Sequence, residues 1–182
     1  GGRMGGMLVS EISRADDLRL VVATDRAGSP HIGLDAGVLV GVGPTDVLLG
    51  SDPASLFSDS DVVIDFSAPE ASLQHAVLAA KTGTAIVIGT TGLSAEQEAV
   101  LRQAATKTAI VYCANTSVGV TLLTQLVEQV AAKLTTGWDI EILETHHHHK
   151  VDAPSGTALA LGKAAARGRQ VDYDRVADMV RN

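Results

Sequence analysis

The chain has 182 residues, of which 46% are hydrophobic and 19% are charged. This composition supplies enough apolar side chains for a sizeable core and too few charges for a disordered protein. The formal net charge of −7 and the 3% of aromatic residues argue against a nucleic-acid partner, which needs clustered positive charge or stacking platforms. No apolar run approaches the roughly 20 residues that cross a membrane, and no signal segment opens the sequence. We therefore expect a globular, cytoplasmic protein with neither a nucleic-acid nor a membrane partner.

The chain opens on a glycine-rich turn, Gly1–Gly6, which leads straight into an amphipathic helix that begins near Met7. A turn of this kind normally follows a strand. We therefore expect that the first strand of the domain is missing upstream of Gly1.

Strands and helices alternate over the next hundred residues. Four β-branched, nearly continuous apolar runs predict strands at 18–23, 61–66, 84–89 and 109–113. Such runs are typical of parallel strands that are covered on both faces. Between them, helical spacing predicts a helix over Pro69–Lys81, and Ser94 with Gln97 forms a capping box that begins another. The pattern predicts an α/β fold, a Rossmann-type domain over residues 1–114 with a parallel sheet.

A second unit is expected over residues 115–182. It begins with a long amphipathic helix, Val118–Leu134, followed by a strand, Trp138–Glu144. A polar loop then leads to a helix that opens near Gly156, and Val171–Asn182 has a helical pattern. No closing strand follows, so we expect a partial α+β domain that is incomplete at its end.

Glycines and one carboxylate point to a dinucleotide. Gly2 and Gly5 have the spacing that lets backbone amides approach a pyrophosphate at a helix N-terminus. Asp25 lies 20 residues after Gly5 at a strand end, where a Rossmann domain places its ribose-binding carboxylate. The adjacent Arg26 suits the 2′-phosphate of NADP, so the pair predicts a site that accepts NADH or NADPH. A generic glycine turn and a salt-bridged pair in a turn are the alternatives.

Two further loops follow predicted strands. They are Gly89-Thr90-Thr91-Gly92 and Ala114-Asn115-Thr116-Ser117. Ligands of open α/β sheets bind beyond the carboxyl ends of the strands, so we expect both loops and the glycine turn to face one crevice. Each loop is also open to interpretation as a mere turn. Cys113, the single cysteine, predicts a reducing compartment and is most simply a small buried side chain.

The densest group of polar residues runs from Glu144 to Thr157 and contains four successive histidines, His146–His149. A purification tag would sit at a terminus, and a zinc site would need further ligands that the neighbouring sequence lacks. Imidazoles beside Lys150 instead predict acid–base chemistry and a local positive site, with no metal. Ser155, Gly156 and Thr157 begin a helix whose free amides suit a carboxylate or phosphate.

Taken together, these motifs resemble those of one family, and the most specific of them is the last. They are Gly2-Arg3-Met4-Gly5, Asp25-Arg26, Gly28-Ser29-Pro30, Asp35-Ala36-Gly37, Asp65-Phe66-Ser67, Gly89–Gly92, Asn115–Val120 and His146–Ala158. The chain resembles the dihydrodipicolinate reductases, also called 4-hydroxy-tetrahydrodipicolinate reductases, of the diaminopimelate route to lysine. The likeness spans essentially the whole chain.

The resemblance implies a Rossmann cofactor domain and a substrate domain that assembles a homotetramer. It implies that NADPH or NADH reduces a cyclic dicarboxylate, with His146 and Lys150 as the proton-transferring residues. It assigns the substrate to His147, Gly156 and Thr157, to which the helix-start argument adds Ser155. It assigns the cofactor to Gly2, Arg3, Met4, Asp25, Arg26, Gly89, Thr90, Thr91, Cys113, Ala114, Asn115 and Thr116.

The sequence departs from the family pattern in several places. The opening strand, the first glycine and the later segments of the second domain are absent, His148 stands where arginine is frequent, and Thr116 replaces a bulkier apolar residue. A non-catalytic nucleotide-binding module or an inactive fragment of such a reductase is therefore the alternative, and a metal hydrolase ranks third.

Overall fold

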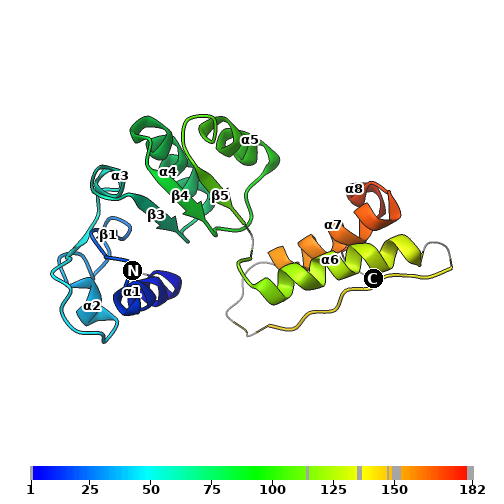
Figure 1. Ribbon diagram of the computed structural model, residues 1–182, viewed down its shortest axis with the longest axis horizontal. Coiled ribbons are helices and arrows are strands. Elements are labelled where there is room, and N and C mark those ends of the chain that lie inside the picture. Colours follow the sequence, from blue (N-terminus) through cyan, green and yellow to red (C-terminus); the bar gives the residue numbers. More distant parts are fainter. Residues whose placement is uncertain (1, 114, 135–136, 147, 149–152, 180–182) are drawn as a thin grey trace. The chain divides into compact units, whose positions relative to one another are not determined.

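The computed structural model describes residues 2–113, 115–134, 137–146, 148 and 153–179. It divides into two compact units, Gly1–Tyr112 and Cys113–Asn182 (Figure 1). This division lies two residues before the predicted boundary.

The first unit alternates helices with short parallel strands. Its elements are α1 (Arg3–Arg14), β1 (Ala23–Thr24), α2 (Ala36–Leu39), β2 (Leu49–Gly50), α3 (Ala54–Asp59), β3 (Val62–Asp65), α4 (Pro69–Thr82), β4 (Ala85–Ile88), α5 (Ala95–Ala104) and β5 (Ile110–Tyr112). β1 pairs with β2, and β3, β4 and β5 form a second sheet in sequence order. Both sheets are parallel, as the alternating pattern predicted.

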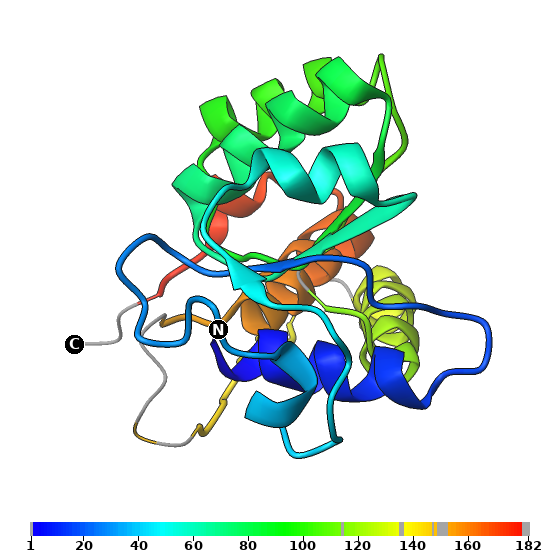
Figure 2. The same ribbon diagram turned by 90° about the vertical axis from the view of Figure 1, so that its left-hand side faces the viewer.

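Helices α4 and α5 lie side by side against the sheet β3–β4–β5 (Figures 1 and 2). They enclose a core that includes Val63, Ile86 and Ile88. The opposite side chains of the same sheet are open: Val62 and Val111 are 51% and 54% exposed. The expectation that these strands are covered on both faces is therefore wrong for this unit, because the helices that meet this core lie on one face only.

Local sequence signals explain the limits of α4 and α5. Pro69 is the first residue of α4, where its missing N–H costs nothing, and Gly83 ends the helix in the left-handed conformation. At α5, the Ser94 hydroxyl accepts from the Gln97 N–H while the Gln97 side chain accepts from the Ser94 N–H. The predicted capping box is thus confirmed.

Two expectations at the start of the chain are corrected. Helix α1 begins at Arg3 and not near Met7, so Gly5 lies inside its first turns. The run 18–23 forms a strand only at Ala23–Thr24. The reason is that its described partner β2 offers two residues, and a ladder extends only as far as its partner.

The second unit consists of α6 (Val118–Lys133), α7 (Gly156–Arg169) and the short α8 (Tyr173–Val176). Helices α6 and α7 pack closely, since a Cβ on Gly168 would meet the Glu128 carbonyl oxygen and would lie 3.0 Å from the Cβ of Ala131. The Arg167 guanidinium also donates to the Glu128 carboxylate at 2.9 Å. Among the described residues, none of these helices or those of the first unit is long and apolar enough to cross a membrane.

The predicted strand Trp138–Glu144 is not formed. The segment has no secondary structure, and Trp138, Ile140 and Ile142 are exposed. The alternation of apolar and polar residues is that of a strand, but a strand needs a partner for its backbone groups, and the described part of this unit offers none. Within the described part of the predicted helical stretch, residues 171–179, the helix is limited to the four residues of α8, and residues 180–182 lie outside the described residues.

Candidate functional site

The N-terminus of α1 is open to an anion. Gly2 is its N-cap, and no side chain in the described part of the chain accepts from the first backbone N–H groups. A Cβ on Gly2 or Gly5 would meet nothing within 4 Å, and the first turn contains no acidic residue. Free amides, a positive dipole end and unfilled space are what a pyrophosphate requires. The residues present therefore fit a dinucleotide, and Arg3 and Met4 begin this turn.

Asp25 and Arg26 follow β1 directly. The Asp25 N–H donates to the Gly50 carbonyl at 2.9 Å, which fixes the strand end, and the Asp25 carboxylate accepts from the Arg26 N–H at 2.8 Å. Burial raises the pKa of Asp25, but hydrogen bonds from Ser29 and from the Arg26 N–H outweigh it and hold the pKa below its usual value. The Arg26 side chain is exposed.

The loop after β4 differs from the expectation in two ways. The space that a side chain at position 89 would occupy is already filled by the Phe66 ring and is not open to a ligand. A Cβ on Gly89 would lie 2.8 Å from Cδ1 of Phe66 and closer still to two other ring atoms. Thr90 is only 6% exposed, and its hydroxyl accepts from the Ser67 N–H at 3.0 Å and from the Ser72 hydroxyl at 2.8 Å. The Thr90 side chain therefore joins two loops of the protein, and its neighbour Thr91 is the more accessible hydroxyl of the pair.

A buried contact between Asp65 and His75 lies beneath these two loops. Oδ2 of Asp65, at the end of β3, is 3.2 Å from Nδ1 of His75 on α4, and both side chains are almost fully buried. Burial raises the pKa of Asp65, but His75 and the hydroxyls of Ser67 and Ser72 outweigh it, so the pKa lies below its usual value. An ionised Asp65 thus anchors the strand end from which the Ser67 loop departs.

The next predicted loop begins the second unit. Cys113 is a free, half-buried thiol, and Asn115 turns its carboxamide oxygen inward to accept from the Ser117 N–H at 2.7 Å. Ser117 in turn caps α6. Thr116 is exposed, and Ala114 lies outside the described residues. Since this loop and the Gly89 loop belong to different units, their expected common crevice stays a prediction.

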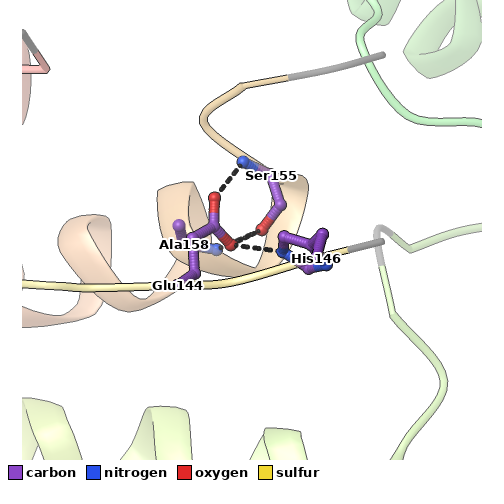
Figure 3. Close-up of polar contacts among 4 residues, drawn as sticks. All are labelled: Glu144, His146, Ser155 and Ala158. Carbon is purple, nitrogen blue, oxygen red and sulfur yellow. Dashed lines mark hydrogen bonds and ion pairs between the residues drawn. The ribbon is translucent and has the colours of Figure 1, made fainter. Parts of the chain in front are cut away.

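Glu144 makes several polar contacts at the start of the polar group 144–157, called here the histidine segment. Its carboxylate accepts from Nε2 of His146 at 2.9 Å, from the Ser155 N–H at 2.8 Å and from the Ser155 hydroxyl (Figure 3). These contacts lower the pKa of Glu144 to about 2, with the Ser155 hydroxyl as the main cause. His146 itself is exposed, whereas Ser155 is buried. The expected substrate role of Ser155 is not supported by this geometry, because its hydroxyl donates to Glu144 and accepts from the Ala158 N–H.

Gly156 and Thr157 keep their N–H groups available at the start of α7. Ser155 caps the helix through the Ala158 N–H, and the structure records no partner for the amides of Gly156 and Thr157 among the described residues. A half-buried helix start of this kind suits a carboxylate. His147 and Lys150, the other predicted residues, lie outside the described residues.

The described residues include no group of three or more side chains arranged to hold a metal ion. Two shallow hollows lie beside α1, of about 280 and 440 Å³. The second includes Arg3, and neither reaches the loops after β3 and β4.

Comparison with known proteins identifies the family. Residues 1–116 match the model of the dihydrodipicolinate reductase N-terminus, and residues 119–181 match the model of the C-terminus. The chain belongs to the dihydrodipicolinate reductase family. It is 51% identical over 181 residues to the 4-hydroxy-tetrahydrodipicolinate reductase of Ruegeria pomeroyi, covering 100% of this chain and 67% of the relative. It is 46% identical over 176 residues to that of Nitrosomonas europaea, covering 97% of this chain and 65% of the relative.

A solved structure is similar as well. The dipicolinate-bound dihydrodipicolinate reductase from Paenisporosarcina sp. TG-14 superposes with a TM-score of 0.69 at 27% identity, over 92% of this chain and 63% of that one. The chain thus spans about two thirds of the length of the family members that it matches.

The sequence did not predict the polar contacts of three residues. Glu144 was placed at the end of a predicted strand and at the start of the polar group that runs to Thr157, with no partner assigned. Asp65 was placed at a strand end and in the Asp65-Phe66-Ser67 motif, and His75 within a helix, without the contact between them. For Glu144 a signal existed, because an acidic residue beside a histidine tract is a natural partner for an imidazole. For Asp65 and His75, ten residues apart, only the packing of α4 on β3 reveals the contact.

Proposed function

We propose that the protein reduces 4-hydroxy-tetrahydrodipicolinate, a cyclic dicarboxylate, with NADPH or NADH, as a step of diaminopimelate and lysine biosynthesis. The observation that carries the proposal is in the histidine segment, where Glu144 binds the imidazole of His146 and the start of α7 follows with available backbone N–H groups. Membership of the family supplies the substrate class.

Each part of the reaction has residues suited to it. The amides of α1 and the Asp25 carboxylate would hold the cofactor, which when bound supplies a hydride. The amides of Gly156 and Thr157 would bind a substrate carboxylate. Loss of the 4-hydroxyl group as water leaves a conjugated C=C–C=N system in the ring. Hydride addition to the alkene end leaves negative charge shared by carbon and nitrogen, so a positioned acid must deliver a proton. His146 and Lys150 are the candidate proton donors.

The proposal is tested by cofactor consumption in the full-length protein with freshly generated substrate. We expect His146→Gln and Lys150→Met each to lower turnover by about 10²–10⁴-fold, the usual contribution of a general acid. Lys107→Met, a change of the same chemistry in the exposed turn after α5, should leave turnover unchanged. Near wild-type turnover in both site variants would refute these assignments, and cofactor binding without turnover would favour a non-catalytic nucleotide-binding module.

Arg26 is proposed to set the cofactor preference. Its exposed guanidinium follows the ribose-binding carboxylate and suits a 2′-phosphate. We expect Arg26→Ala to weaken NADPH binding more than NADH binding, as measured by cofactor titration. Arg102→Ala on α5, where the arginine pairs with Glu98, is the matched control. An unchanged ratio of the two affinities would mean that Arg26 does not contact the 2′-phosphate.

We also propose that the protein is cytoplasmic and assembles as a homotetramer through its second unit. Three exposed apolar side chains recur along α6 at four-residue intervals, Leu122, Leu126 and Val130. The segment after α6 exposes Trp138 and Leu143 as well. Apolar surface of this extent is typical of an interface. Light scattering should report four copies, and Leu126→Lys should reduce that number.

A further inference from the structure

Glu144 occupies an unusual position for an acidic side chain, because among the described residues its hydrogen bonds lead to His146 and Ser155 (Figure 3). One oxygen, Oε1, accepts from the backbone N–H of Ser155. The other, Oε2, accepts from the Ser155 hydroxyl and from Nε2 of His146. The carboxylate thus connects the end of an extended segment, the exposed imidazole and the N-cap of α7.

This arrangement decides which ring nitrogen of His146 holds a proton. A carboxylate is an acceptor only, so Nε2 of His146 must be the donor of the 2.9 Å contact. When the ring is neutral, Nδ1 is then left with its lone pair; when the ring is charged, Nδ1 carries the second proton. Nδ1 is therefore the nitrogen through which His146 can give or take a proton while the contact with Glu144 persists.

The Ser155 backbone N–H fixes which atom of the side chain at position 144 must be an oxygen. Because its N–H requires an acceptor, the atom at the Oε1 position must be an oxygen. An amide at position 144 would keep its oxygen there and turn its NH₂ group toward the Ser155 hydroxyl and His146. The NH₂ group can only donate, so Nε2 of His146 would have to accept, and the proton of the neutral ring would move to Nδ1.

We propose that Glu144 is a positioning residue that holds His146 in the Nε2–H form, so that proton transfer to or from the substrate occurs at Nδ1. The catalytic part of this inference rests on the proposed function, whereas the tautomer part does not. The same logic governs the carboxylate that orients the histidine of a Ser-His-Asp triad, where an amide substitution gives the wrong tautomer. The low pKa of Glu144 is consistent with a carboxylate that stays ionised throughout.

The experiment reads the tautomer directly. In the isotope-labelled 182-residue chain, long-range ¹H–¹⁵N spectra distinguish Nε2–H from Nδ1–H, and His146→Gln assigns the signal. We expect the neutral His146 ring to be Nε2–H in the wild type and Nδ1–H in Glu144→Gln. Asp139→Asn is the same kind of change at an exposed position of the extended stretch 138–146, and it should leave the ring as Nε2–H. An Nδ1–H ring in the wild type, or an Nε2–H ring in Glu144→Gln, would overturn the proposal.

Turnover of the full-length protein supplies the second measurement. Glu144→Gln should lower kcat by about 10²-fold or more, with KM for the cofactor unchanged, because the cofactor residues are untouched. A wild-type kcat in Glu144→Gln would refute the catalytic part. If the wild type shows no reductase activity, but the neutral His146 ring is Nε2–H in the wild type and Nδ1–H in Glu144→Gln, the proposed function fails and the positioning role of Glu144 stands. Circular dichroism that matches the wild type establishes that α7 is intact in the variant.

Discussion

The contact between Gly89 and Phe66 allows a quantitative test of why a glycine follows β4. A Cβ at position 89 would lie 2.8 Å from Cδ1 of Phe66 and closer to Cε1 and Cζ, whereas carbon atoms in contact prefer about 3.5–4.0 Å. The ring must therefore move by about 1 Å or leave its site. Overpacking of this kind costs roughly 1–3 kcal/mol. We expect Gly89→Ala to reduce the free energy of unfolding by that amount, or the melting temperature by about 4 °C per kcal/mol for a unit of this size.

The assay is urea unfolding followed by circular dichroism, arranged as a double-mutant cycle. In a Phe66→Ala background the obstacle is gone, so Gly89→Ala should be nearly neutral, and the coupling should equal the cost in the wild type. Gly92→Ala is the control, because Gly92 has φ +83° and pays about 1–2 kcal/mol in either background. If Gly89→Ala costs the same with and without Phe66, the ring is not the reason for the glycine. A double variant that is stable but fails to bind the cofactor would instead assign the glycine to ligand approach.

Three further substitutions test other contacts. Asp65→Asn should lower the free energy of unfolding by about 1–3 kcal/mol at neutral pH, because it removes the carboxylate that faces buried His75. Since the pKa of Asp65 is lower in the folded than in the unfolded protein, its stabilisation is complete above the unfolded pKa and is lost as pH falls through the folded pKa. If the wild type and the variant lose stability in parallel below about pH 4, the assignment is contradicted. Ser94→Ala removes the capping box of α5 and should cost about 1 kcal/mol in urea unfolding, and a neutral result would mean that the box does not stabilise the helix. Gly168→Ala places a methyl group against the Glu128 carbonyl and should lower the melting temperature of the second unit, with an unchanged melting curve as the contrary result.

How much of the fold was predictable from the sequence depends on the range of the forces involved. Pro69, Gly83 and the Ser94–Gln97 box act within one helical turn, and the structure places both ends of α4 and the start of α5 where these residues predict them. The strand expected at 138–144 could form only beside a second strand, and no local sequence signal shows which segment that would be. Its apolar alternation is genuine, but the ladder is missing from the described residues.

The candidate site shows the same division. The open amides at Gly2 and at the start of α7 follow from glycine spacing and from an N-cap serine, both of which are local signals. The inward hydroxyl of Thr90 does not, because its partners Ser67 and Ser72 come from another loop and helix. A threonine in a glycine-rich loop suggests a ligand, and only packing reveals that its hydroxyl is already used.

The close packing of α6 and α7 has a consequence for how the second unit opens. Ala164, Ala165 and Ala166 are buried, and Gly168 lets the two backbones approach without intervening side chains. Neither helix can separate without exposing the other, so their central amides should exchange with solvent deuterium at one common rate. The segment 138–146 has no backbone ladder and should exchange far sooner. The histidine that we assign to proton transfer is therefore carried by the fast-exchanging part of the unit, while the slow-exchanging helix pair holds Ser155, the point to which Glu144 ties it.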